Sequence, residues 1–248
     1  MTLVWTRSPF YWEVDKKKLE KEKVNYIYLP CLDYEVLLKK NKLPPRFCDS
    51  SSVFVFTSYF AAKVILEDHR FKDVLKQSII FVMGQKTFEL FQGEELNVQL
   101  RESLSAKGLA CQVVKEIKKQ SILYLPGAKE RAFLIGDFFR EQGFESFEID
   151  CYRTLAKVRK ENKSKLTNLE KKFLVLNTSS IFVFASSLTV ESFLEEFKMF
   201  EKQLKEKVRA IVLGERTEKS CLGFFAETRV TAKPSFSLAI QMYKNMTN

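Results

Sequence analysis

Hydroxyl, glycine and basic side chains gather in eight short turns, each placed after an apolar run of the sequence. The turns read TRSP (6–9), TSYF (57–60), GQKT (84–87), SAKG (105–108), PGAKER (126–131), ASSL (185–188), GERT (214–217) and PSFS (234–237). Backbone amides at a helix N-terminus, hydroxyl donors and arginine or lysine side chains all bind anionic groups. The set predicts a binding site for a ligand that carries many negative charges.

Two of these turns share the pattern G-x-x-T. Gly84 and Gly214 let the backbone approach a ligand closely, while Thr87 and Thr217 can cap a helix or donate to a ligand oxygen. A single turn of this kind can equally be an ordinary helix cap.

The residue types that other chemistries need are sparse. The one histidine, His69, has no nucleophile pattern beside it, which disfavours a Ser-His-Asp triad or a His-ligated metal, and it is interpreted as a solvated surface residue. The five cysteines are scattered without a CxxC pair, which favours reduced thiols over a disulfide framework or a zinc site. They are Cys31, Cys48, Cys111, Cys151 and Cys221.

The net charge of +10 on 248 residues indicates attraction for anions without saying which ones. The densest basic runs, at 15–23 and 157–172, also contain acids and are interpreted as solvated faces. No nucleic-acid module is visible, no apolar run approaches the roughly 18 residues of a membrane span, and the N-terminus lacks a secretory pattern. We therefore expect a cytoplasmic protein that binds neither nucleic acid nor membrane.

The turns recur because the sequence repeats itself. FVFTSYFAAKVIL (54–66) is answered by FVFASSLTVESFL (182–194), which puts Phe184 128 positions after Phe56. Gly84 and Gly214 are 130 positions apart, whereas the run LVWTRS (3–8) returns as ILYLPG (122–127) at a shift near 120. Several matches in one order predict two copies of one structural unit.

The elements that hold these turns follow from the apolar pattern. Short, nearly continuous apolar runs such as 78–84 and 209–214 predict buried strands, and they alternate with stretches of helical periodicity. Thr57, Ser58, Ser186 and Ser187 are available as helix N-caps. The predicted class is α/β, with a flavodoxin-like parallel sheet in each of two domains, and ligands are expected beyond the carboxyl ends of the strands.

The sequence resembles the uroporphyrinogen-III synthase family over nearly its whole length. The resemblance lies in the order and spacing of TRSP, FTS (56–58), GQKT, SAKGL (105–109), PGAKERAFL (126–134), YRT (152–154), FASS (184–187), GERT and KPSFSLA (233–239). It implies two α/β domains joined by a two-stranded connector, with the substrate in the cleft between them. Residues 1–31 and 156–248 would form one domain, and 32–155 the other.

The resemblance also implies an activity. Members of this family are lyases of haem biosynthesis that cyclise hydroxymethylbilane, a linear tetrapyrrole with eight carboxylates, inverting ring D and releasing water. Tyr152 matches the family's tyrosine and is the expected proton donor, and the other copy has Leu32 in its place. Neither a metal nor an organic cofactor is implied, and a monomer is expected.

The candidate substrate contacts come from the same motifs. They are Arg7, Thr57, Ser58, Gly84, Lys86, Thr87, Ser105, Arg131, Ser186, Ser187, Gly214, Arg216 and Thr217, with Arg153 as a further candidate cation. For each cation, an ordinary surface position is the alternative.

Several positions depart from the family pattern: Ala185 stands for a threonine, Gln85 and Glu215 stand where proline is common, and EKEKVNYI (20–27) lacks the usual glycine before its strand. A carboxylate at Glu215 would repel an anionic substrate unless a cation neutralises it. A catalytically degenerate relative that binds an anionic ligand or a partner is therefore the alternative function. A basic nucleic-acid module is a more distant one.

Overall fold

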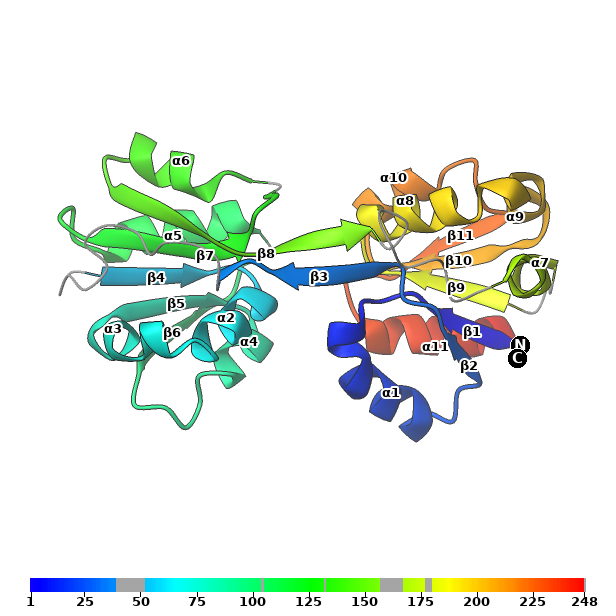
Figure 1. Cartoon of the computed structure of the whole chain (residues 1–248), viewed down its shortest axis with the longest axis horizontal. Helices are drawn as coiled ribbons and strands as arrows, with labels where there is room; N and C mark the ends of the chain where they lie inside the picture. The colour runs from blue at the N-terminus through cyan, green and yellow to red at the C-terminus, as the bar shows by residue number, and fades with distance from the viewer. Residues whose placement is uncertain (39–51, 104, 132, 157–166, 177–179, 248) are drawn as a thin grey trace. The chain divides into compact units, whose positions relative to one another are not determined.

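The computed structural model describes residues 1–38, 52–103, 105–131, 133–156, 167–176 and 180–247 (Figure 1). The chain divides into two compact units, described here one at a time. Unit 1 comprises Met1–Tyr34 and Leu155–Asn248, and unit 2 comprises Glu35–Thr154. The domain limits inferred from the sequence, 1–31 with 156–248 and 32–155, stay a prediction.

Unit 1 contains a five-stranded parallel sheet in the order β11-β10-β9-β1-β2. Its strands are β1 (Thr2–Trp5), β2 (Tyr26–Tyr28), β9 (Ser180–Phe184), β10 (Arg209–Val212) and β11 (Glu227–Val230). Its helices are η1 (Pro9–Tyr11), α1 (Trp12–Lys21), α7 (Asn168–Leu176), α8 (Ser187–Glu196), η4 (Lys198–Phe200), α9 (Glu201–Lys207), α10 (Glu215–Cys221) and α11 (Phe236–Thr247).

Unit 2 repeats this sheet, and one strand is added at its edge, giving the order β3-β8-β7-β4-β5-β6. The strands of this sheet are β3 (Leu32–Val36), β4 (Ser52–Phe56), β5 (Ile79–Met83), β6 (Asn97–Arg101), β7 (Ile122–Ala128) and β8 (Glu145–Ala156). The start of β3 and the end of β8 belong to unit 1. The helices of unit 2 are α2 (Tyr59–Leu66), η3 (His69–Phe71), α3 (Lys72–Gln77), α4 (Gln85–Glu89), α5 (Ala106–Glu116) and α6 (Ile135–Glu141). The predicted α/β class with parallel sheets is confirmed.

The pairing of the strands repeats along with their order. Phe54 in β4 lies opposite Ile80 in β5, and Phe182 in β9 lies opposite Ala210 in β10. These pairs are related by the same shifts of 128 and 130 residues that relate the sequence motifs. The two units therefore share topology and register, and turns that match in sequence occupy matching places.

The chain crosses between the units in β3 and near the end of β8, which are neighbouring strands. Just before each crossing is a buried cysteine: the Cys31 thiol donates to the Leu29 carbonyl and the Cys151 thiol to the Ile149 carbonyl, both at 3.5 Å. Burial raises the pKa of the Cys151 thiol to about 12, so this group stays protonated. Cys31, Cys111, Cys151 and Cys221 are free thiols, while Cys48 lies outside the described residues.

The cores form because the central strands are apolar on both faces, as parallel sheets covered by helices require. Every residue of β4 and of β9 is buried. In unit 1, Phe182 and Phe184 pack against α8, while Ile181 and Val183 belong to the cluster that α1 and α11 complete. Figure 1 shows α8 on one face of this sheet and α1 and α11 on the other. Among the described helices, none is both long enough and apolar enough to cross a membrane.

Candidate functional site

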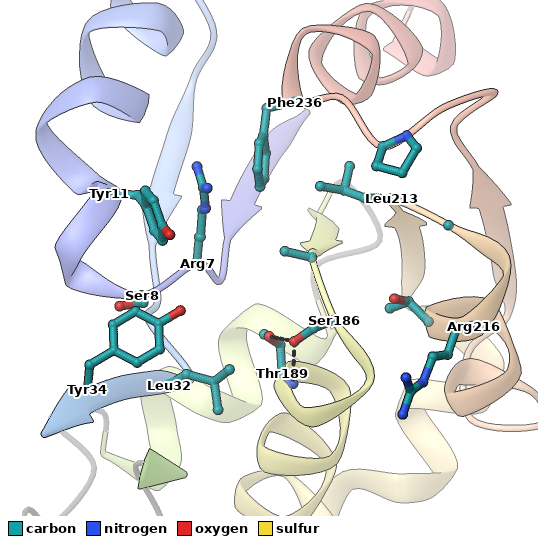
Figure 2. A pocket seen from close by; sticks show the side chains of 14 residues that line it. Arg7, Ser8, Tyr11, Leu32, Tyr34, Ser186, Thr189, Leu213, Arg216 and Phe236 are labelled. Atoms are coloured by element: carbon teal, nitrogen blue, oxygen red, sulfur yellow. Dashed lines mark hydrogen bonds between the residues drawn. The ribbon is translucent and has the colours of Figure 1, made fainter. Parts of the chain in front are cut away.

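A cavity of about 440 Å³ lies in unit 1, beyond the carboxyl ends of β1, β9 and β10 (Figure 2). Parallel sheets bind ligands at this edge because several helix N-termini and connecting turns meet there. The lining residues are Arg7, Ser8, Tyr11, Leu32, Tyr34, Ala185, Ser186, Thr189, Leu213, Gly214, Arg216, Thr217, Pro234 and Phe236. They include five of the thirteen residues that the sequence nominates for substrate binding.

Arg7 stands in the wall of this cavity between two aromatic rings. Its guanidinium carbon lies 3.6 Å from the ring centroid of Tyr11 and 4.1 Å from that of Phe236, and Figure 2 shows it between the two side chains. Its Nη1 donates to both oxygens of Asp15, at 3.0 and 3.1 Å. Asp15 is buried and also accepts the indole N–H of Trp5 at 3.0 Å. The stack and the ion pair fix the arginine and balance its charge.

Arg216 is the second cation of the cavity and is exposed. Within the described part of the chain its guanidinium makes no ion pair, whereas Arg7, Arg131 and Arg153 each do. The Ser187 hydroxyl donates to the Arg216 backbone carbonyl at 3.1 Å, which ties the start of α8 to α10. Arg216 therefore keeps its charge available for a ligand.

Ser186 caps the N-terminus of α8, as the sequence predicts. Its Oγ accepts the Thr189 N–H at 3.3 Å and lies 2.8 Å from the Thr189 hydroxyl. Ser187 is instead the first residue of the helix. A helix of ten residues directs its unpaired amides and the positive end of its dipole toward the cavity.

The two G-x-x-T turns differ in their backbone. Gly84 has φ +84°, a conformation that residues with a Cβ rarely adopt, whereas Gly214 has an extended backbone. A Cβ built on Gly214 would meet nothing within 4 Å. Thr87 and Thr217 are buried, and the N–H of each closes its turn on the glycine carbonyl, at 3.1 and 3.0 Å. These backbone bonds begin α4 and α10, whose N-cap residues are the glycines and have no side-chain cap hydrogen bond.

In unit 2 the matching turns begin three helices. Ser58 caps α2 by accepting the Ala61 N–H at 3.3 Å, and Thr57 precedes it as a half-buried residue. Lys86 is exposed in the first turn of α4. Ser105 caps α5 by accepting the Gly108 N–H at 3.1 Å. The predicted hydroxyls thus lie at helix N-termini here as well.

Arg131 makes an internal clamp rather than an open cation. It pairs with Asp150 at 2.7 Å and with Glu148 at 3.6 Å, and it donates to the Ile149 carbonyl at 3.1 Å. Only 10% of its side chain is exposed. Since two carboxylates already surround it, the guanidinium has little capacity left for a third.

Arg153 also has an acidic partner, because its Nε donates to Glu35 at 2.7 Å. This pair joins β8 to β3. Its half-exposed position allows the arginine to exchange partners more readily than Arg131.

Tyr152 lies at the end of the sheet in unit 2, with its hydroxyl 3.1 Å from the Ser58 hydroxyl. The ring of Phe60 meets it edge-on at 4.7 Å. Burial raises the pKa of Tyr152 above its ordinary value, and the Ser58 hydrogen bond offsets part of that rise. The phenol is therefore protonated at neutral pH and can act as a proton donor.

The sequence-derived candidates form separate groups in the two units. Arg7, Ser186, Gly214, Arg216 and Thr217 surround the cavity of unit 1. In unit 2, Ser58 meets Tyr152, while Arg131 is held by acidic neighbours.

Sequence reasoning missed the aromatic wall of the cavity, made by Tyr11, Tyr34 and Phe236. The available signal was the run FYW at 10–12, directly after TRSP. It also missed the partner of Arg7, because Asp15 opens a lysine-rich run that was interpreted as solvated. The second basic run, 157–172, lies mostly outside the described residues.

Among the described residues, no group of three or more His, Cys, Asp or Glu side chains is arranged to hold a metal ion. His69 is exposed at the start of η3.

The family model described as uroporphyrinogen-III synthase HemD matches residues 13–237. The crystal structure of uroporphyrinogen-III synthetase from Helicobacter pylori 26695 is similar, with a TM-score of 0.66 and 17% identity over 99% of each chain. A mutant uroporphyrinogen III synthase from the extremely thermophilic bacterium Thermus thermophilus has a TM-score of 0.56 and 14% identity, over 100% of this chain and 99% of that one. At these identities the two structures show a shared fold. No curated protein sequence matches this one at a significant level.

Proposed function

The chain belongs to the uroporphyrinogen-III synthase family, and we propose that it cyclises hydroxymethylbilane to uroporphyrinogen III, with inversion of ring D and loss of water. The observation that carries this proposal is the extent of the family match. Residues 13–237 include every described strand of both sheets except β1, and every hydroxyl-rich turn except the first.

The cavity of unit 1 supports the proposal because its chemistry suits a pyrrole with carboxylate arms. Arg216 offers an unbalanced positive charge, and the N-terminus of α8 offers amides for a carboxylate. Tyr11, Tyr34 and Phe236 add aromatic side chains to the lining, and aromatic side chains pack well against flat rings. One cavity of about 440 Å³ holds part of a tetrapyrrole rather than all of it.

Tyr152 supports the first chemical step. Ring closure requires the terminal hydroxyl of the substrate to leave as water, which a proton donor accelerates. Burial keeps the phenol protonated across the neutral range, and the ring of Phe60 packs edge-on against it. We assign Tyr152 as this donor. The reaction is redox-neutral, so the proposal includes no cofactor.

The departures from the family pattern have a modest structural effect on the cavity. Ala185 lines it and removes one hydroxyl. Glu215 is exposed at the first position of α10 and is not among the lining residues described for the cavity. Neither observation favours the catalytically degenerate alternative.

The test is a product analysis. Hydroxymethylbilane generated in place is supplied to the purified protein, the products are oxidised, and the porphyrin isomers are separated. An active synthase gives the type III isomer, whereas spontaneous closure gives type I. Type I alone, at every protein concentration, would refute the proposed function. Light scattering of the same sample tests the proposed monomer.

A further inference from the structure

The serines that cap α2 and α8 occupy matching places in the two units but use their hydroxyls differently. Ser58 and Ser186 are 128 positions apart, and each accepts the N–H three residues later at 3.3 Å. Those residues are Ala61 and Thr189, which are matched by the same shift. The two cap bonds thus have the same length, but the side chains around the two serines differ.

In unit 1 the second bond of the cap serine stays within its own helix. The Ser186 hydroxyl lies 2.8 Å from the Thr189 hydroxyl, as the dashed line in Figure 2 shows. The residue that matches Tyr152 by the shift of 120 is Leu32, at the start of β3. It lines the cavity and has no polar atom in its side chain. Among the described residues, Thr189 is the hydroxyl partner of Ser186.

In unit 2 both neighbours have changed. Ala61 is fully buried and has no hydroxyl, and the crossing residue is Tyr152, matched to Leu32 by a shift of 120. The Ser58 hydroxyl accordingly lies 3.1 Å from the Tyr152 hydroxyl. Because Ala61 offers no hydroxyl, the Ser58 hydroxyl forms its hydrogen bond with Tyr152 instead.

Either hydroxyl of this 3.1 Å pair can be the donor, and the cap bond that Ser58 Oγ accepts favours the serine as the donor. Ser58 Oγ already accepts the Ala61 N–H, and its own hydrogen is left to donate. When Ser58 donates its hydroxyl hydrogen to the Tyr152 oxygen, the phenolic proton of Tyr152 points away from the serine. We propose that Ser58 is the positioning residue for Tyr152: it orients the phenolic proton toward the substrate and stabilises the phenolate after transfer. This inference rests on the proposed function.

The proton balance of the step is simple. The phenolic O–H bond breaks, and its proton joins the leaving hydroxyl. The C–O bond breaks with its electron pair on the departing water, and the pyrrole nitrogen supplies electrons to the methylene carbon, giving a cationic azafulvene. Ser58 keeps its own proton throughout.

The electrostatics agree with this geometry. Burial raises the pKa of Tyr152, and the Ser58 hydrogen bond lowers it. Losing the serine hydroxyl removes the hydrogen bond that lowers the pKa of Tyr152 and leaves the burial that raises it. The phenol then becomes a weaker acid.

The experiment reads the phenol directly. Difluorotyrosine at position 152, which titrates at lower pH than tyrosine, is followed by fluorine NMR in the full chain, and the type III rate is measured with unmodified Tyr152. Ser58→Ala should raise the fluorophenol pKa and lower kcat about three- to tenfold, the effect of one hydrogen bond, with KM changed less than about twofold. Ser58→Thr keeps a hydroxyl and should restore both values.

Two further variants separate positioning from capping. Ser186→Ala loses the matching cap bond in unit 1 and should leave the titration at position 152 unchanged. Ala61→Thr copies the unit 1 arrangement, offers Ser58 a competing hydroxyl and should raise the fluorophenol pKa with the cap intact; it also serves if Ser58→Ala does not fold.

The outcomes distinguish this inference from the function beneath it. An active enzyme whose Tyr152 titration is the same with and without the Ser58 hydroxyl would overturn the positioning role alone. A wild-type protein that forms no type III isomer would overturn the proposed function, whatever the titration shows.

Discussion

The Asp15 carboxylate accepts hydrogen bonds from Nη1 of Arg7 at 3.0 and 3.1 Å, so this arginine is already charge-balanced in the wall of the cavity. An arginine that is nominated as a ligand contact from its motif thus has a structural partner in the same unit. The candidate cations thus divide into Arg7, Arg131 and Arg153, which pair with carboxylates, and Arg216, which makes no ion pair within the described part of the chain.

Replacing Asp15 with Ala should destabilise unit 1 by about 2–4 kcal/mol, because the change leaves Arg7 and the Trp5 N–H without their buried acceptor. Urea unfolding measures this free energy. The matched control is Glu13→Ala, an exposed carboxylate in the same helix, which should change it by less than about 0.5 kcal/mol. Equal effects of the two variants would show that the Asp15 network adds nothing.

Replacing Arg216 with Ala should raise KM for hydroxymethylbilane about tenfold and leave stability unchanged, because its charge has no partner in the described protein and is free for a carboxylate. The measurement is the initial rate of type III formation against substrate concentration. Lys219→Ala removes an exposed charge from the same helix, away from the cavity, and should leave KM unchanged. A similar rise in KM for both would mean that only net charge matters.

Replacing Arg131 with Ala should lower the free energy of unfolding by about 2–4 kcal/mol, because it leaves Asp150 and Glu148 facing each other uncompensated. Its measured effect should be on stability, and KM should change little at a temperature where the variant is folded. Lys129→Ala, an exposed control in the preceding turn, should change neither quantity. A large KM effect in a stable Arg131 variant would instead assign it to the substrate.

Replacing Tyr152 with Phe should lower kcat about tenfold to a hundredfold without abolishing type III formation, since a phenol is a modest general acid. The same variant has a signature in stability. The pKa of Tyr152 is higher in the folded chain than the ordinary value of 10.0, so folding loses stability as pH rises from 10 toward that higher pKa. Urea unfolding at neutral pH and above pH 10 should show a smaller alkaline loss for Tyr152→Phe than for wild type. Equal losses would contradict the raised pKa.

Replacing Gly84 with Ala should cost about 1–2 kcal/mol, because φ +84° strains a residue that carries a Cβ. Gly214→Ala is the matched comparison in the other unit: its backbone is extended and its Cβ meets nothing, so stability should hold. Thermal unfolding of both variants measures the contrast. A rise in KM for Gly214→Ala at unchanged stability would indicate that substrate approaches this backbone.

The fold was accessible from sequence because its signals are local. The apolar runs that became β4 and β9 are bounded by small polar residues, and their repeat at 128 positions reappears as a repeated strand register. The caps at Ser58 and Ser186 follow from the same short-range pattern.

The state of each side chain in the candidate site was less accessible, because it depends on tertiary partners. Nothing near Arg131 in the sequence indicates that its guanidinium would form an ion pair with Asp150, nineteen positions later. Asp15 stands before three lysines, yet it faces inward to Trp5. Ser58 and Tyr152 are 94 positions apart, and only the strand order of unit 2 brings them together.

The insertion of unit 2 within unit 1 also sets the order in which the protein can assemble during synthesis. Unit 2 is one continuous stretch, so its sheet can close soon after β8 emerges from the ribosome. In the other unit, β1 lies between β2 and β9, and β9 begins only at Ser180. The edge of β1 that pairs with β9 therefore stays unpaired until more than two thirds of the polypeptide has been translated.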